Sequence, residues 1–332
     1  MSRKNKVAII FTGGTISMKV DPRLKAAIPA LSSEEIIGMV TNIEKLADIE
    51  VINYANIASP HITPDMMMDI AKLVKETVDR EDIIGVIVTH GTDSLEETAY
   101  LLDLVNNTEK PIIVIGAMRN SSELGYDGSS NLAAGICTAV SDNSRNKGVL
   151  VVMNNEVNAA TEVTKTNTLS LDTFKSPEFG PLGIVDNDEV IFYRNIVARQ
   201  FIDTDFIENK VALIKSVPGI ESDILNFYID SGYKGIIIEA MGRGNVPPSL
   251  IPGIERAIKE GIPVVMVSRC PTGRVLGTYG YQGGGKHLRD LGVILGGNLP
   301  GQKVRIKLML ALSVTKELSE IQDIIEENLF HI

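Results

Sequence analysis

Two threonines lie just beyond short apolar runs of the sequence. Thr15 follows the run 7–11 after two glycines, and Thr92 follows the run 83–88 and is itself followed by Asp93. Glycines let the backbone turn sharply where a strand ends, so each hydroxyl would be held at the mouth of a sheet. Two such hydroxyls, one of them next to a carboxylate, indicate nucleophilic chemistry without a Ser–His pair.

Both motifs also have a structural interpretation. A threonine in a glycine-rich turn can simply satisfy backbone groups. The segment Asp93–Glu96 has the form of a capping box, in which Asp93 caps a helix and Glu96 occupies its third position. Alternatively, Thr92 and Asp93 face a pocket from a helix N-terminus, whose free N–H groups suit a carboxylate or an oxyanion. Both interpretations stay open, because one Asp can cap a helix and bind a ligand.

Lys165 is a single lysine within the polar run Thr164–Thr168. The ordinary expectation for a lysine is a solvated surface position. A lysine buried beside a threonine can instead act as a base, because burial lowers its pKa, and a nearby carboxylate such as Asp93 raises that pKa again. Lys165 is therefore a candidate catalytic residue whose protonation state the sequence leaves open.

The four histidines are His61, His90, His287 and His331, and they share no metal-ligand spacing. We interpret His90 as ordering the turn before the second threonine, and a substrate contact by His61 stays an alternative. The glycine clusters match neither common phosphate-binding pattern. We therefore expect no metal site and no cofactor.

The apolar runs predict strands that alternate with helices. The predicted strands are Val7–Phe11, Ile83–Val88, Pro111–Gly116, Gly148–Met153, Val211–Lys215, Gly235–Met241 and Pro263–Arg269. The predicted helices include Pro64–Asp79, Ser94–Val105, Ser130–Ser141 and Ile251–Glu260. Such alternation favours an α/β fold with a parallel-rich sheet covered on both faces, which binds ligands beyond the carboxyl ends of its strands. Both threonine motifs fall at such ends.

The polar segment 191–210 interrupts this alternation and is interpreted as a linker. It would join an N-terminal α/β catalytic domain of residues 1–190 to a smaller C-terminal α/β domain of residues 211–332. The region Thr164–Gly183 shows little helix or strand signal. We interpret it as a long functional loop.

Composition excludes several function classes. The chain of 332 residues carries a net charge of −10, which argues against a nucleic-acid binder. Only five apolar residues follow the basic N-terminus, and no stretch approaches the roughly 18 that a membrane helix needs. Cys137 and Cys270 have no metal-like spacing and are interpreted as reduced thiols in or near the core. We expect a soluble, cytoplasmic protein with no membrane partner.

Together these motifs resemble the bacterial-type L-asparaginase (asparaginase/glutaminase) family. The stretches that carry the resemblance are Thr12–Ile16, Thr89–Tyr100, Gly116–Arg119, Asp127–Gly128, Asn131–Leu132, Val163–Thr168 and Pro271–Gly273. The resemblance covers nearly the whole chain. It implies a larger N-terminal and a smaller C-terminal α/β domain. It also implies a homotetramer built as a pair of intimate dimers, with sites completed across subunits.

The resemblance also implies catalytic roles. In that family the first threonine attacks a side-chain amide and forms an acyl-enzyme that water hydrolyses. By this likeness Thr15 is the nucleophile, Thr92 and Lys165 assist proton transfer, and Asp93 lies near the substrate amino group. Backbone N–H groups near the two threonines would hold the oxyanion.

Substrate-binding roles follow from the same resemblance. Ser59 would contact the substrate carboxylate, and Ala117 would offer its backbone carbonyl near the leaving amide. Gly91 counts among the substrate-binding positions. Asn245 would come from a neighbouring subunit, although an ordinary turn asparagine is the alternative.

Three features depart from the family pattern. Family members usually carry a tyrosine in the mobile loop after the nucleophile, but the segment 17–28 contains none. Pro60 replaces the usual polar residue after the serine, and the family's cross-subunit glutamate has no clear equivalent near 280–283. Tyr279 or Tyr281 is a candidate for the missing phenol.

We therefore predict a cytoplasmic amidohydrolase that converts L-asparagine to L-aspartate and ammonia without a cofactor. One alternative is a hydrolase of another small amide or of a D-amino acid amide, motivated by the altered loop and Pro60. The other is a non-catalytic amino-acid-binding protein on the same fold.

Overall fold

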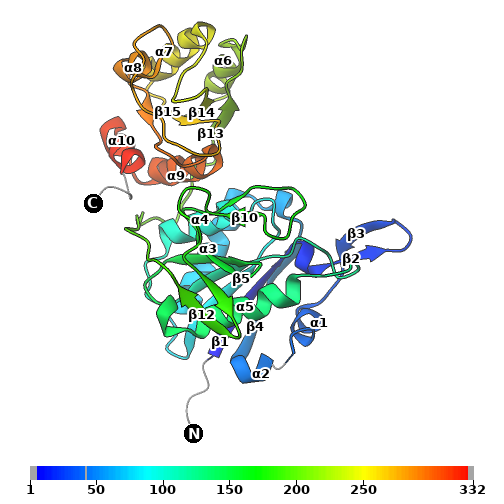
Figure 1. Ribbon diagram of the computed structural model, residues 1–332. Helices are drawn as coiled ribbons and strands as arrows, with labels where there is room; N and C mark the ends of the chain where they lie inside the picture. Colours follow the sequence, from blue (N-terminus) through cyan, green and yellow to red (C-terminus); the bar gives the residue numbers. More distant parts are fainter. Residues whose placement is uncertain (1–5, 42, 328–332) are drawn as a thin grey trace. The chain divides into compact units, whose positions relative to one another are not determined.

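The computed structural model describes residues 6–41 and 43–327. The chain divides into two compact units, Met1–Phe201 and Ile202–Ile332, each with its own sheet (Figure 1). The division falls inside the segment 191–210. The beginning of that segment is not a linker, because a strand of the first unit extends to Phe192.

The first unit is built on a sheet of eight strands in the order β12-β11-β8-β7-β6-β5-β1-β4. The strands are β1 (Lys6–Gly13), β4 (Asp48–Ile57), β5 (Ile83–Thr89), β6 (Ile112–Ile115), β7 (Val149–Met153), β8 (Glu156–Ala159), β11 (Gly183–Asp186) and β12 (Glu189–Phe192). The strands β4, β1, β5, β6 and β7 are mutually parallel. This sheet confirms the predicted parallel-rich α/β class.

The remaining strands, β8, β11 and β12, extend the sheet in antiparallel pairings that the alternation pattern did not predict. Two of the connections are two-residue turns with positive φ at both positions, Asn154–Asn155 and Asn187–Asp188. Asparagine and aspartate tolerate the left-handed conformation that such hairpin turns require. These turn residues are the sequence signal for the hairpins.

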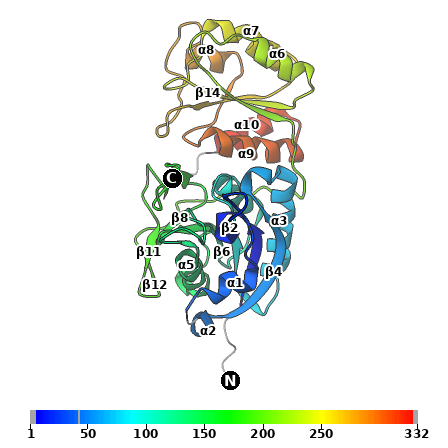
Figure 2. The ribbon, with the colours of Figure 1, turned by 90° about the vertical axis from the view of Figure 1, so that its right-hand side faces the viewer.

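Helices cover both faces of the sheet. The helices of this unit are α1 (Ser33–Gly38), α2 (Ile43–Leu46), α3 (Pro64–Val78), α4 (Leu95–Val105) and α5 (Gly128–Val140). Figure 2 shows α5 and α3 on opposite sides of the strands. The predicted helices in this unit are present to within two residues at each end. The buried faces of α1 and α5 share one apolar core with β1, β5, β6 and β7.

Two small hairpins lie outside the main sheet. One pairs β2 (Met18–Asp21) with β3 (Ala26–Pro29) and covers most of the tyrosine-free segment 17–28. The other pairs β9 (Thr164–Lys165) with β10 (Phe174–Lys175). The region expected to be a long loop is therefore partly a hairpin. Its strands have only two residues each, too few to give a periodic pattern.

The second unit has a sheet of four parallel strands in the order β13-β14-β15-β16. The strands are β13 (Val211–Lys215), β14 (Gly235–Ala240), β15 (Val264–Ser268) and β16 (Ile294–Leu295). The helices are α6 (Asp223–Asp230), α7 (Ile251–Lys259), α8 (Gly285–Asp290), α9 (Gly301–Val314) and α10 (Leu318–Glu326). Cys137 of the first unit is buried as expected, but Cys270 is exposed, because it lies in the turn after β15.

Candidate active site

The two threonine turns lie side by side because β1 and β5 are adjacent strands, with Phe11 in register with Thr89. The hydroxyl of Thr12 donates to the carbonyl of Thr89 at 2.6 Å. Gly14 has φ +85°, and a Cβ there would lie 2.4 Å from the backbone nitrogen of Gly91. Glycine therefore allows the direct contact between the turns.

A cavity of about 200 Å3 opens beside this contact. It contains six of the eight site residues expected from the sequence, Thr15, Ser59, Gly91, Thr92, Asp93 and Lys165. Its other lining residues are Gly14, Met18, Ala58, Pro60, Met118 and Thr168. The structure thus brings residues from separate segments of the chain to one small space.

Lys165 is directed to the second threonine turn rather than to solvent. Its Nζ donates to Thr92 Oγ1 at 2.9 Å and to Asp93 Oδ1 at 2.8 Å. The Lys165 side chain is 17% exposed, whereas that of Asp93 is 63% exposed. Because the ammonium donates to Thr92 Oγ1, the proton of the Thr92 hydroxyl is available for another acceptor.

Ser59 joins the cavity to the start of α4. Its hydroxyl oxygen accepts from the backbone N–H of Asp93 at 3.2 Å, and its carbonyl accepts from the hydroxyl of Ser94 at 2.9 Å. Ser59 is buried, although the serine hydroxyl keeps a proton to donate. This places a hydroxyl donor beside the first turn of α4.

The capping box expected over 93–96 does not form. The N-cap of α4 is Ser94, whose side chain makes no capping bond. Glu96 instead accepts from the hydroxyl of Thr164 at 3.2 Å and from the backbone N–H of Lys165 at 3.3 Å. The expected box is lost because its two side chains bond to the hairpin instead: Asp93 to the ammonium of Lys165, and Glu96 to Thr164 and the backbone of Lys165.

His90 orders the turn, as the sequence indicated. Its ring is buried, with Nδ1 2.8 Å from the carbonyl of Gly91 and Nε2 2.8 Å from the hydroxyl of Thr98. A carbonyl only accepts, so we assign the proton to Nδ1 and a donated bond from Thr98 to Nε2. Burial lowers the pKa of His90 to about 4, which keeps the ring neutral. His61, in contrast, is exposed and does not line the cavity.

Ala117 does not line the cavity. It is fully buried, and its neighbour Met118 forms that part of the wall instead. The backbone N–H groups of Met118 and Arg119 are held by the carboxylate of Asp127, at distances of 2.9 to 3.1 Å. The Ala117 carbonyl remains a candidate contact only as part of this fixed turn.

Tyr126 does not line the cavity but bonds to the first threonine turn, a contact that the sequence did not reveal. Its hydroxyl donates to the carbonyl of Ile16, the residue after the candidate nucleophile, at 2.7 Å. Burial raises the pKa of Tyr126, so the phenol stays protonated and serves as a donor. No spacing rule links positions 16 and 126, and the only signal was that Tyr126 directly precedes the Asp127–Gly128 motif.

Asn245, Tyr279 and Tyr281 belong to the second unit. Asn245 closes a tight turn, exchanging backbone hydrogen bonds of 2.9 Å with Met241. Its side-chain Oδ1 is buried and accepts no hydrogen bond from the described residues. Both tyrosine rings are exposed and lie together, with centroids 5.7 Å apart.

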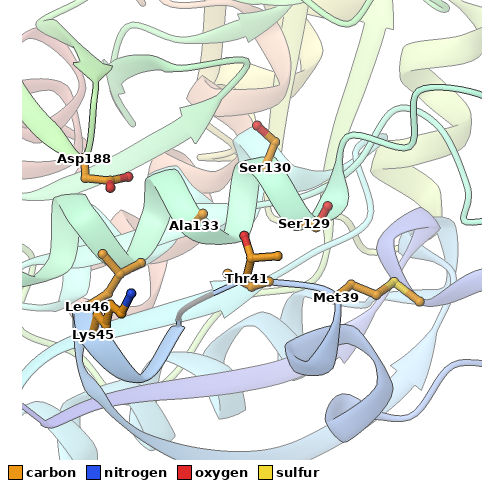
Figure 3. A pocket seen from close by; sticks show the side chains of 9 residues that line it. Met39, Thr41, Lys45, Leu46, Ser129, Ser130, Ala133 and Asp188 are labelled. Carbon is orange, nitrogen blue, oxygen red and sulfur yellow. The ribbon is translucent and has the colours of Figure 1, made fainter.

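A larger cavity of about 430 Å3 lies elsewhere in the first unit, between the α1–α2 connection and α5 (Figure 3). Figure 3 shows Lys45 and Asp188 near one end and the hydroxyls of Thr41, Ser129 and Ser130 toward the other. Asp188 at its rim is exposed. The smaller cavity has the stronger claim to chemistry, because it joins a largely buried lysine to two threonines.

Among residues 6–41 and 43–327, no group of three or more His, Cys, Asp or Glu side chains is placed to hold a metal ion. No helix in the same part of the chain is long and apolar enough to cross a membrane.

Comparison with known proteins gives matches over nearly the whole chain. The family model for the N-terminal domain of asparaginase matches residues 6–198, and that for the glutaminase/asparaginase C-terminal domain matches residues 210–325. A probable periplasmic L-asparaginase from Haemophilus influenzae is 35% identical over 97% of this chain and 92% of its own length. A glutamyl-tRNA(Gln) amidotransferase subunit from Pyrococcus abyssi is 36% identical over 97% of this chain and 75% of its own length.

A solved structure agrees with these matches. The crystal structure of a probable cytoplasmic L-asparaginase from Campylobacter jejuni superposes with a TM-score of 0.88, at 32% identity, over 97% of this chain and 99% of that one. The matched family models cover both units and the segments that form the cavity. The chain therefore belongs to the asparaginase family and is an amidohydrolase that acts on linear amides.

Proposed function

We propose that this protein hydrolyses the side-chain amide of L-asparagine to give L-aspartate and ammonia. The observation that carries the proposal is the meeting of Thr15, Thr92 and Lys165 around one cavity of about 200 Å3. Pockets for drug-sized ligands hold roughly 300–1,000 Å3, so the smaller volume suits a single amino acid. The names of asparaginase relatives support the same substrate.

In the proposed mechanism Thr15 is the nucleophile. Its hydroxyl oxygen attacks the amide carbon, and the C–N bond then breaks to leave an ester on Thr15. The hydroxyl proton passes to the departing nitrogen through the Thr92–Lys165 pair, so ammonia leaves neutral. Water then adds to the ester, releases aspartate and restores the Thr15 hydroxyl. The 2.9 Å bond from Lys165 to Thr92 Oγ1 supports this relay, because it leaves the Thr92 proton free to be donated.

Substrate binding would use the ends of the same turns. The exposed carboxylate of Asp93 suits the substrate ammonium, and the buried hydroxyl of Ser59 suits its carboxylate. The partial positive charge at the start of a helix favours negative charge near the first turn of α4. We assign binding of the oxyanion to backbone N–H groups near Thr15 and Thr92, where Gly91 lets the substrate approach the backbone closely. The leaving amide would contact the carbonyl of Ala117.

We further propose a homotetramer in which Asn245 of one subunit completes the site of another. The buried Asn245 Oδ1 that accepts no bond from the described residues supports this, because a buried acceptor of this kind favours a donor from a partner or ligand. Light scattering after size exclusion tests the assembly. A monomer of about 36.0 kDa with full activity would contradict it.

We propose a cytoplasmic location as well. The exposed, unpaired Cys270 suits a reducing compartment, and the Campylobacter relative is named as cytoplasmic. The Haemophilus relative is described as periplasmic, so fractionation of expressing cells decides between the two compartments.

Ammonia release across an amide panel tests the function. We expect turnover of L-asparagine by the wild type and a loss of at least about 1,000-fold in Thr15→Ala, as for removal of other catalytic nucleophiles. Faster hydrolysis of a D-amino acid amide than of L-asparagine would replace L-asparagine as the assigned substrate. Binding of L-asparagine without ammonia release would favour a non-catalytic amino-acid-binding protein.

A second candidate function is that of an amidotransferase subunit. The similarity to the amidotransferase from Pyrococcus abyssi is as high as that to the asparaginases. On that alternative the chain would supply ammonia within a complex. It predicts that amide hydrolysis by the isolated chain is slow and rises only when a partner is added.

A further inference from the structure

Glu96 is a buried carboxylate beside the cavity with no role in the mechanism above. It lies in the first turn of α4 and is 6% exposed. One oxygen, Oε1, accepts from Thr164 Oγ1 at 3.2 Å and from the backbone nitrogen of Lys165 at 3.3 Å. The other oxygen, Oε2, is buried and has no hydrogen-bond partner among the described residues.

Helix stability does not explain this placement. A glutamate in a first turn is stabilising when it is solvated or caps the helix. Glu96 does neither, and burying a carboxylate with one unpaired oxygen costs free energy. The backbone N–H of Asp93 is satisfied instead by Ser59. The side chain of Glu96 is thus used on the hairpin rather than on its own helix.

The hairpin needs such support. The strand β9 has two residues and pairs only with the two residues of β10. A ladder this short fixes a backbone weakly, yet Lys165 must reach Thr92 within hydrogen-bonding distance. Glu96 binds the main chain of Lys165 while Thr92 and Asp93 hold its ammonium. The turn 92–96 therefore holds both ends of the same lysine.

We propose that Glu96 is a positioning residue that fixes the strand carrying Lys165 and so sets the Lys165–Thr92 contact. This rests on the proposed function insofar as that contact moves a proton. The effect on rate follows from geometry, because misplacing a catalytic group by about 1 Å can cost roughly 100-fold in rate. Substrate-binding groups on Ser59 and Asp93 would be left in place.

The test compares Glu96→Ala with Glu96→Gln, which keeps an oxygen acceptor for Thr164 and Lys165. We expect Glu96→Ala to lower kcat by roughly 100-fold with KM changed by less than about threefold, and Glu96→Gln to recover most of kcat. Thr164→Val, which removes one of the two donors, should give an intermediate loss. Thermal unfolding identifies any variant that fails to fold.

A second readout does not depend on turnover. Modification of Lys165 by an amine-reactive reagent, followed by peptide mass spectrometry, should be faster in Glu96→Ala than in the wild type, with Lys286 as an exposed internal standard. Faster labelling supports the positioning role of Glu96 whether or not the protein shows amidase activity. An absence of amidase activity would contradict the proposed function but not this positioning role. An unchanged labelling rate and an unchanged kcat in folded Glu96→Ala overturn the inference.

Glu97→Gln is the matched control. It removes a neighbouring carboxylate from the same first turn of α4. We expect its kcat to stay within about threefold of wild type, because Glu96 and its bonds to Thr164 and to the backbone nitrogen of Lys165 are kept, and a change of charge at a helix end is a small effect. A loss in Glu97→Gln equal to that in Glu96→Ala would assign the effect to helix charge and overturn the inference.

Discussion

The hydroxyl of Tyr126 lies 2.7 Å from the carbonyl oxygen of Ile16, and so ties the α5 side of the first unit to the turn that carries Thr15. We expect Tyr126→Phe to lose about 1 kcal/mol of unfolding free energy, as for a typical hydrogen bond. We also expect kcat to fall, by less than the roughly 100-fold cost of a 1 Å misplacement. Tyr54→Phe, which removes a long 3.5 Å bond to Met66, is the control for both measurements.

Removing the ammonium should stop proton transfer. We expect Lys165→Met to lower kcat by roughly 100- to 10,000-fold, the usual range for a general acid or base. Lys165→Arg should not restore activity, because a planar guanidinium that stays protonated cannot replace an ammonium in a relay. Lys175→Met, in the paired strand of the same hairpin, should keep kcat near wild type in steady-state ammonia assays. Activity within about tenfold of wild type in Lys165→Met would remove the lysine from the mechanism.

A side chain at Gly14 should separate the two threonine turns. Its φ of +85° is strained for any L-residue, and a Cβ would lie 2.4 Å from the Gly91 backbone. We expect Gly14→Ala to lose more than the roughly 1–3 kcal/mol of backbone strain alone, and to abolish turnover. Gly180→Ala is the matched control, since its φ is +70° with nothing within 4 Å of the added Cβ. Urea unfolding of both variants separates the clash from the backbone strain.

The stability of the first unit should depend on His90 in acid. Burial lowers the pKa of His90 from 6.5 to about 4 in the folded state. Between about pH 6.5 and about pH 4, the unfolded chain therefore binds a proton at this histidine that the folded chain does not bind. The free energy of unfolding is therefore highest above about pH 6.5 and decreases as the pH falls from about 6.5 to about 4. Between about pH 7.5 and about pH 5 the wild type should lose about 2 kcal/mol more than His90→Gln. Equal losses in urea titrations would show that His90 protonates normally in the fold.

The segment 191–210 should contribute to the stability of the first unit, because Arg199 is anchored there. Its guanidinium pairs with the buried carboxylate of Asp103 at 3.0 Å and donates to the carbonyl of Asn106 at 3.1 Å. We expect Arg199→Met to cost about 3–5 kcal/mol, because it leaves a buried charge uncompensated. Arg145→Met, which breaks the exposed pair with Glu109, should cost no more than about 1 kcal/mol in the same denaturation assay.

The elements that depend on local chemistry were predictable from the amino-acid sequence alone. The apolar run Ile83–Val88 predicted β5, and the helical spacing of Pro64–Asp79 predicted α3, each to within one residue at either end. A strand buried on both faces gives a continuous apolar run, whereas a helix buried on one face gives apolar residues at helical spacing. Gly14 and Gly91 marked the turns, and the adjacent threonines marked the chemistry. Resemblance to a family supplied the roles that spacing could not.

Contacts between polar groups from distant segments could not be predicted in this way. Glu96 bonds the hairpin instead of capping its helix, and Tyr126 reaches Ile16 across 110 positions of the chain. The two-residue strands β9 and β10 and the turn at Asn154 were also not predicted from the sequence. A hydrogen bond between distant segments depends on how strands and helices are stacked, and stacking leaves no period in the sequence. Local patterns therefore predicted the strands and turns, whereas the packing of the sheet brought Lys165 to Thr92.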